Sequence, residues 1–135
     1  MEGPVSPSLV NPPGLPAAVG FSHVAVAQQG AVFLAGQTGH RQDGTISSGL
    51  VDQFAQACRN VQLCLDEVGV SPEDLVSLQI LVTDMTGYRS ALSELGVAYR
   101  NVFGKVYPPM SLLGVVELFD PAALVELVAV AAKPG

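Results

Sequence analysis

The strongest constraint on the fold is an apolar run near the C-terminus that a single acid, Glu126, interrupts. Side chains alternate between the two faces of a β-strand, so Glu126 shares one face with Leu124 and Val128. Val125 and Leu127 occupy the other face. Apart from the carboxylate, both faces are apolar, which is typical of a strand that is covered on both sides. The pattern therefore predicts a covered strand that carries one buried carboxylate.

That carboxylate has two possible explanations. Moving a carboxylate out of water is costly unless it is paired, hydrogen-bonded or protonated. Glu126 is therefore either a structural acid satisfied by its neighbours or a general acid and base whose pKa is tuned by the site. The remaining features of the chain favour the second interpretation.

The clearest helix is predicted over 51–68, where apolar residues recur at alternating spacings of three and four. This stripe consists of Val51, Phe54, Cys58, Val61, Leu65 and Val68. Gly69 then ends the helix, and Ser71 with Asp74 predicts a short capped turn. A second helix is predicted over 86–103.

Alternating or apolar runs bounded by turn residues predict the strands. The predicted strands are 21–28, 31–36, 76–83, 111–118 and 124–131, with a further short strand near 45–47. Two helices can cover only one face of such a sheet. Because the strands carry apolar residues on both faces, we expect the second face to be buried against another subunit.

The composition agrees with an oligomer. Hydrophobic residues make up 49% of the chain and charged residues only 13%, whereas a small monomer should expose more charge. The chain has 135 residues, which suits one domain. Residues 1–16 contain five prolines, so we expect an extended arm that is a poor strand and is partly disordered at its start. A single domain over 17–135 follows it.

The charges exclude several classes of function. The formal net charge is −6, and the six Lys and Arg residues are scattered along the chain. Nucleic-acid binding needs clustered cations, so neither a nuclease nor an RNA-binding protein is expected. The sequence has no apolar stretch long enough to span a membrane and no signal-peptide pattern. We therefore expect a cytoplasmic protein that does not bind membranes.

The two cysteines, Cys58 and Cys64, fall on different faces of the predicted helix and cannot pair with each other. No cysteine or histidine spacing typical of a metal site occurs. We expect buried, reduced thiols and no bound metal.

Short motifs stand in a fixed order along the chain. They are Asn11-Pro12-Pro13-Gly14, Gly20-Phe21-Ser22-His23-Val24, Val32 to Gln37, Asp84-Met85, Tyr107-Pro108-Pro109-Met110-Ser111 and Leu124-Val125-Glu126-Leu127. In this order they resemble the Rid family, also called YjgF or endoribonuclease L-PSP, from about residue 11 to residue 132. The resemblance implies an α+β, chorismate-mutase-like fold with a mixed sheet and two helices on one face. It also implies a homotrimer with three inter-subunit clefts.

The resemblance further implies an imine or enamine deaminase that needs no cofactor. Such enzymes hydrolyse intermediates like 2-aminoacrylate to ammonia and a 2-keto acid. Glu126 matches the water-activating acid of the family, and Gly36 and Gln37 match its cleft wall. Met110 matches the arginine that binds the substrate carboxylate, a bidentate role that methionine cannot fill.

Two further positions depart from the family in the same apolar direction. Phe21 matches a cleft tyrosine, and Leu112 matches a cysteine. An apolar wall around Glu126 should raise its pKa by desolvation, so that it could protonate an imine and then activate water. The chain is expected to be a hydrolase or deaminase for a small imine, enamine or carbonyl metabolite, with altered specificity. The alternative is a trimer that binds or senses a metabolite without turnover.

Three cationic side chains remain open to two interpretations each. His23 is expected to be structural rather than a catalytic base. His40 is expected to lie in a solvated loop, although it could reach the cleft mouth and supply the cation that Met110 lacks. Arg100 is expected to be a surface charge and could alternatively anchor a ligand.

Overall fold

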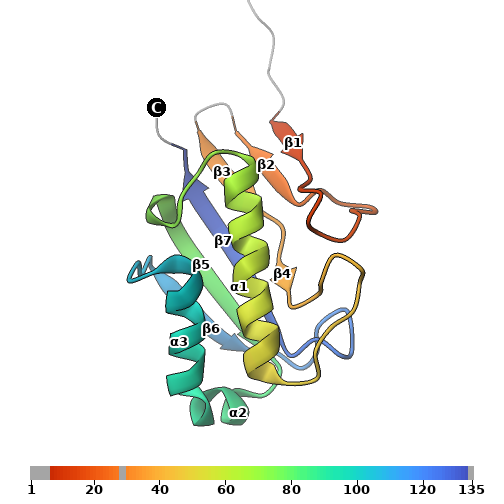
Figure 1. Ribbon diagram of the computed structural model, residues 1–135, viewed down its shortest axis with the longest axis vertical. Helices are drawn as coiled ribbons and strands as arrows, with labels where there is room; N and C mark the ends of the chain where they lie inside the picture. Colours follow the sequence, from red (N-terminus) through yellow and green to blue (C-terminus); the bar gives the residue numbers. More distant parts are fainter. Residues whose placement is uncertain (1–6, 28–29, 134–135) are drawn as a thin grey trace, which may run out of the picture.

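The computed structural model describes residues 7–27 and 30–133 and forms a single sheet covered on one face by helices (Figure 1). The strands are β1 (Ser8–Val10), β2 (Val24–Val26), β3 (Ala31–Leu34), β4 (Gln37–Thr38), β5 (Leu75–Val82), β6 (Met110–Gly114) and β7 (Val125–Ala132). The helices are α1 (Leu50–Glu67), α2 (Met85–Ser90) and α3 (Leu92–Phe103), with a 3₁₀ turn, η1 (Pro72–Asp74).

The sheet is mixed and runs in the order β1-β2-β3-β7-β5-β6, with β4 also paired to β7. Only β5 and β6 are parallel, and all other described pairs are antiparallel. The long strand β7 therefore lies at the centre of the sheet, as the C-terminal apolar run predicts. This α+β fold with a mixed sheet confirms the expected fold class.

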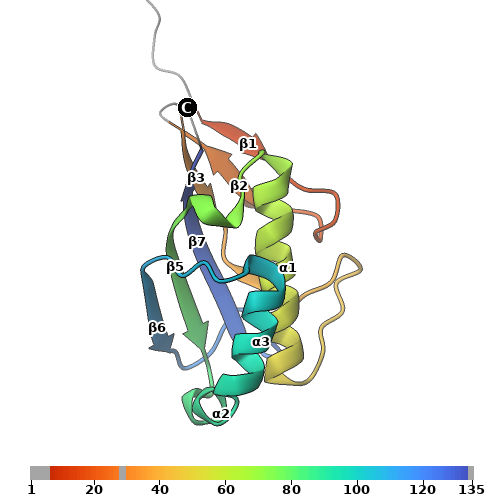
Figure 2. The ribbon, with the colours of Figure 1, turned by 60° about the vertical axis from the view of Figure 1, so that its left-hand side comes forward.

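Helices α1 and α3 lie side by side on one face of the sheet (Figure 2). Val125 and Leu127 of β7 point toward them and are fully buried. The opposite face carries Glu126 and has no helix over it in the described part of the chain. Apolar side chains are exposed there, including Phe33 at 51% and Leu113 at 44%. The helices of one chain thus cover only one face of the sheet, although its strands carry apolar side chains on both faces.

The predicted stripe of α1 forms the core of the helix layer. Phe54, Cys58, Val61 and Leu65 are buried, and burial of each large apolar side chain contributes about 1.5–3 kcal/mol. The helix ends where predicted, because Gly69 adopts a φ of 72° that residues with a Cβ rarely adopt. The predicted capped turn after it is confirmed as η1.

The second helix differs from the prediction over 86–103, because it is broken into α2 and α3 at Ala91. The Ser90 hydroxyl donates to the Thr86 carbonyl at 3.0 Å, and such a side-chain bond often bends a helix. Asp84 caps the first segment, since its Oδ1 accepts from the Gly87 N–H at 2.9 Å. The polar start of this region therefore forms a separate turn of helix.

Several predicted strands are shorter than expected. The first begins at Val24 rather than at 21 and ends at Val26, and the strand expected over 111–118 spans Met110–Gly114. Near 45–47 the chain forms only an isolated bridge between His40 and Ile46. Instead of the expected strand, this segment forms a loop that its own polar side chains stabilise.

The proline-rich arm was wrongly expected to be a poor strand throughout. Its proline-free segment Ser8–Val10 pairs with β2 as an edge strand, where flanking prolines are tolerated. Leu15 is buried in the core at 4% exposure, so the end of the arm packs against the fold. Residues 1–6, where disorder was expected, lie outside the described residues.

No helix within the described ranges combines the length and the apolar character needed to cross a membrane.

Candidate functional site

Glu126 lies on the open face of the sheet at the centre of β7. It is directly opposite Leu81 of β5 on one side and Thr38 of β4 on the other. Gly36 packs against its carboxyl group, because a Cβ at position 36 would lie only 2.6 Å from Cδ and Oε2 of Glu126. The backbone at Gly36 therefore forms one wall of the acid's environment, as expected for the cleft wall.

A cavity of about 510 Å³ opens in front of this carboxylate. It is lined by Val19, Phe21, Ala35, Gly36, Thr38, His40, Phe119, Asp120 and Glu126. Glu126 is half-buried, and desolvation raises the pKa of its carboxyl group above the ordinary value. Desolvation therefore favours the protonated form of this carboxyl group more than it would at an exposed acid.

A polar network stands beside Glu126 in the same cavity. Nδ1 of His40 lies 2.6 Å from the Thr38 hydroxyl, and Nε2 lies 2.8 Å from Oδ2 of Asp120. Hydrogen bonds from the Ala122 N–H and from His40 lower the pKa of the Asp120 carboxyl. His40 therefore reaches the cavity, which is the less favoured of its two predicted placements.

Gln37 is buried at 4% exposure rather than being displayed in this cavity. Its amide nitrogen donates to the Ala35 carbonyl and to Nδ1 of His23, both at 3.2 Å. The His23 Nε2–H donates to the Pro16 carbonyl at 2.9 Å. These bonds satisfy both side chains, in agreement with a structural role for His23. They border a second cavity of about 240 Å³, which shares Phe21, Gly36, Thr38 and His40 with the first.

Met110 and Leu112 lie on the other face of the sheet. In the parallel pairing of β6 with β5, Met110 is opposite Leu78 and Leu112 is opposite Ile80. Leu78 and Ile80 are buried on the helix side, so their partners face the same way. Within one chain, the structure does not bring Met110 or Leu112 together with Glu126.

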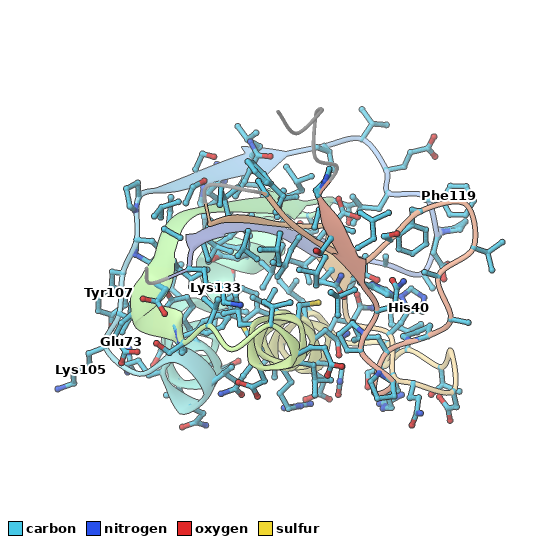
Figure 3. The ribbon with its side chains drawn as sticks, turned by 90° about the horizontal axis from the view of Figure 1, so that it is seen from above. His40, Glu73, Lys105, Tyr107, Phe119 and Lys133 are labelled. Carbon is cyan, nitrogen blue, oxygen red and sulfur yellow. The ribbon has the colours of Figure 1, made fainter. Side chains whose placement is uncertain are left out.

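Met110 instead lines a third cavity, of about 210 Å³, between α3 and the sheet. The aromatic side chains of Tyr88, Tyr99 and Tyr107 also line it, together with Arg100. Figure 3 shows Tyr107 on the opposite side of the molecule from His40 and Phe119. The predicted site residues are therefore spread over the chain: Glu126, Phe21 and Gly36 line the first cavity, Gln37 lines the second and Met110 the third. Leu112 is not among the residues that line these three cavities.

Among the polar and aromatic residues that line the Glu126 cavity, sequence reasoning missed three: Thr38, Phe119 and Asp120. Thr38 follows Gly36 by two positions and so points to the same face, which is a signal the alternation could have given. Around Phe119 and Asp120 the sequence indicated only a turn between two strands. Their place in the cavity depends on how the loop before β7 folds back toward His40.

In the described part of the chain, no three His, Cys, Asp or Glu side chains come together as metal ligands.

The chain resembles known proteins over most of its length. Residues 13–133 match the family model described as endoribonuclease L-PSP. A RutC family protein from Aquifex aeolicus (strain VF5) is 31% identical over 125 residues, covering 90% of this chain and 97% of that protein.

Solved structures share the fold as well. A YjgF-family protein from Mycobacterium tuberculosis is 28% identical, with a TM-score of 0.71, and the match covers 88% of this chain and 97% of that one. E. coli TdcF with bound serine is 22% identical, with a TM-score of 0.82 over 94% of this chain and 99% of that one.

Proposed function

The chain belongs to the endoribonuclease L-PSP family, also called Rid or YjgF, and on this premise we propose that it hydrolyses a small reactive imine or enamine. A related carbonyl metabolite is an equivalent substrate class. Glu126 activates the attacking water, and the products are ammonia and a carbonyl compound. The reaction needs no cofactor.

The observation that carries this proposal is the half-buried Glu126 carboxyl at the wall of a cavity of about 510 Å³. Desolvation raises the pKa of this carboxyl group, as is typical of carboxyl groups that act as general acids. As a carboxylic acid, Glu126 can protonate the imine nitrogen. As a carboxylate, it can take the proton of the water whose oxygen bonds to the imine carbon.

We place the substrate between subunits of a homotrimer. Phe33 and Leu113 expose apolar surface on the sheet face that also carries Glu126. Packing this face against a neighbouring copy would bury that surface. A cleft between copies could then combine the Glu126 cavity of one chain with the Met110 cavity of another.

Within such a cleft, the proposed substrate-binding residues are Phe21, Gly36, Gln37, Met110 and Leu112. Most of these side chains are apolar, and methionine at position 110 gives no bidentate grip on a carboxylate. We therefore propose a specificity that differs from that of relatives with arginine at this position.

Ammonia release from imines tests the proposal. The imines are generated in the assay by an L-amino-acid oxidase, giving carboxylate-bearing substrates, or by an amine oxidase, giving neutral ones. Wild-type protein should accelerate release from at least one class, and Glu126→Gln should lower kcat at least about 10²-fold. Glu117→Gln, at an exposed acid, is the matched control. Wild-type kcat in Glu126→Gln would overturn the assignment.

Met110→Arg extends the assay to specificity. This change should lower KM for carboxylate-bearing imines and leave the neutral class unchanged. A variant that loses both classes equally would argue against the proposed role of position 110.

The second candidate is a trimer that binds a metabolite without turnover. One observation favours it: TdcF, a solved relative with this fold, holds serine. This function predicts a rise in the thermal midpoint with amino acids or 2-keto acids that are recovered unchanged. Chemical consumption of the stabilising compound would exclude it.

A further inference from the structure

A network of three side chains, Thr38, His40 and Asp120, stands beside Glu126. From this geometry we propose that His40 is a second acid–base group of the site, coupled to Glu126 through the Thr38 hydroxyl and oriented by Asp120. The inference rests on the proposed function in assigning the reaction, but the network itself can be tested separately.

The partners of His40 fix its tautomer. A carboxylate can only accept hydrogen bonds, so the Nε2–H of His40 donates to Oδ2 of Asp120 over 2.8 Å. In neutral His40, Nδ1 then has no proton and accepts from the Thr38 hydroxyl at 2.6 Å. The lone pairs of the Thr38 oxygen are left for a neighbour or a ligand.

Protonation of His40 reverses the direction of the second bond. Nδ1–H now donates to the Thr38 oxygen, and the Thr38 hydroxyl proton is free to donate elsewhere. Thr38 lines the Glu126 cavity and is the cross-strand partner of Glu126. Directly opposed residues have Cβ atoms about 4.5–5.5 Å apart, so the freed hydroxyl lies within reach of the carboxyl group or of a ligand between them.

The network is held by buried groups rather than by a loose loop. The Asn60 side-chain amide, on α1, donates to the carbonyls of Thr38 and His40 at 2.9 and 2.8 Å. Gly39, between them, leaves no room for a Cβ, which would lie 2.6 Å from the Gln53 carbonyl oxygen. The close contact with α1 therefore fixes the backbone that carries both side chains.

Few other charges face this group within the described residues. Glu126 on β7 and Asp120 in the loop before β7 line the cavity with His40. The neighbouring Arg41 side chain bonds to Thr45 and Ser47. From α1, the segment is contacted by the uncharged residues Asn60, which bonds to it, and Gln53, which packs against Gly39. Glu126 and Asp120 are therefore the two carboxylates that face His40 across the cavity.

The reaction can be written with all protons balanced. The water oxygen bonds to the imine carbon while its proton goes to the Glu126 carboxylate. The imine nitrogen takes a proton from Thr38, which takes one from charged His40. The carbinolamine hydroxyl then returns its proton to neutral His40 through Thr38, and the C–N bond breaks as nitrogen takes the proton held by Glu126. Ammonia leaves, and both groups regain their starting states.

The first experiment measures kcat and KM for the imine assay across pH with four variants. His40→Gln and Thr38→Val should each lower kcat about 10²-fold with little change in KM, and Thr38→Ser should restore most of the loss. Asp120→Asn should retain partial kcat and shift its pH profile. Thr86→Val and Asp66→Asn, at exposed positions, are the matched controls.

Two outcomes separate this inference from the proposed function. Loss of activity in Glu126→Gln with wild-type kcat and pH profile in His40→Gln would overturn the network and leave the proposed function standing. If wild-type protein hydrolyses no imine, the proposed function fails while the coupling is decided by NMR.

In the NMR experiment, the His40 imidazole is titrated in wild type, Glu126→Gln and Thr38→Val. The expected result is that neutral His40 is the Nε2–H tautomer and that its titration midpoint moves in Glu126→Gln. Once Thr38 is valine, the further change Glu126→Gln should leave the midpoint where it is. An Nδ1–H tautomer, or a midpoint unaffected by Glu126, overturns the inference. If Thr38→Val does not fold, Thr38→Ala takes its place.

Discussion

The carboxyl group of Glu126 occupies the space that a side chain at position 36 would need, since a Cβ at Gly36 would lie 2.6 Å from Oε2 of Glu126. Real Cβ atoms do not approach this closely, so the residue at 36 and the position of the acid are coupled. The backbone conformation itself does not require glycine, because φ at Gly36 is not in the left-handed region. The close approach of the Glu126 carboxyl group alone explains why position 36 is glycine.

Gly36→Ala should displace the Glu126 carboxyl group and lower imine turnover at least about 10-fold, because even small misplacements of reacting groups cost much of the rate. Gly49→Ala is the control, since a Cβ there meets no atom within 4 Å. Crystal structures and kcat of both variants provide the measurement. Unchanged turnover in Gly36→Ala would show that the position of Glu126 is not critical.

Glu126→Gln should change stability in a pH-dependent way. Burial raises the folded-state pKa of Glu126, so its stabilising contribution is complete below the unfolded-state pKa and is lost as pH rises through the folded-state value. Glutamine stays neutral throughout. The variant should match wild type near pH 4 and have a higher thermal midpoint than wild type near pH 8.

The control for this titration is Glu117→Gln, at an exposed loop position, whose difference from wild type should be small and constant with pH. A Glu126→Gln protein that is less stable than wild type near pH 8 would contradict the desolvation argument.

Asn60→Leu should destabilise the fold by about 2–4 kcal/mol, because it leaves two backbone carbonyls in the site segment without their donor. Asn60 is buried at 2% exposure and bonds to the carbonyls of Thr38 and His40. Asn101→Leu, at an exposed position of α3, should cost under about 0.5 kcal/mol. Denaturant unfolding measures both, and equal effects would remove the special role of Asn60.

Phe33→Asp should dissociate the proposed trimer. Phe33 is 51% exposed on the open face of the sheet, while Val97 on α3 is 49% exposed. Val97→Asp is therefore a control of equal exposure, and it should leave the trimer intact. Light scattering coupled to size exclusion gives the mass. A monomeric wild type, or a trimeric Phe33→Asp protein, would count against assembly through this face.

Neither thiol should react in the folded protein. Burial raises the pKa of Cys58 and of Cys64 to about 12, so the thiolate at neutral pH is about 10³-fold rarer than in an unfolded chain. A thiol reagent should modify both cysteines only in denaturant. Ser48→Cys, at an exposed position, should add one thiol that reacts at once. Rapid labelling of native wild type would indicate local opening of α1.

The sequence predicted the elements whose period is unambiguous. The stripe from Phe54 to Leu65 determined α1, and the alternation around Glu126 determined β7. Boundaries that depend on side-chain bonds were less predictable, as the break at Ala91 illustrates. The short strand Ser8–Val10 exists because β2 offers it a partner, which composition alone does not reveal.

For the site, the sequence by itself determined that Glu126 is a carboxylate within an apolar strand. The resemblance to the Rid family implied that Gly36 and Gln37 stand near a cleft wall. Alternation also determined that Met110 and Leu112 share a face. It could not decide which face, because the choice depends on the register that pairs them with Leu78 and Ile80 of β5.

Only the tertiary structure decided which groups surround the acid. His40 and Asp120 are 80 positions apart in the sequence yet 2.8 Å apart between Nε2 and Oδ2. Local propensity acts over a few residues, whereas this contact requires β4 to pair with β7 and the loop before β7 to fold back over it. The sequence thus determined the acid and its strand through local periodicity, while long-range pairing decided which groups line the cavity in front of it.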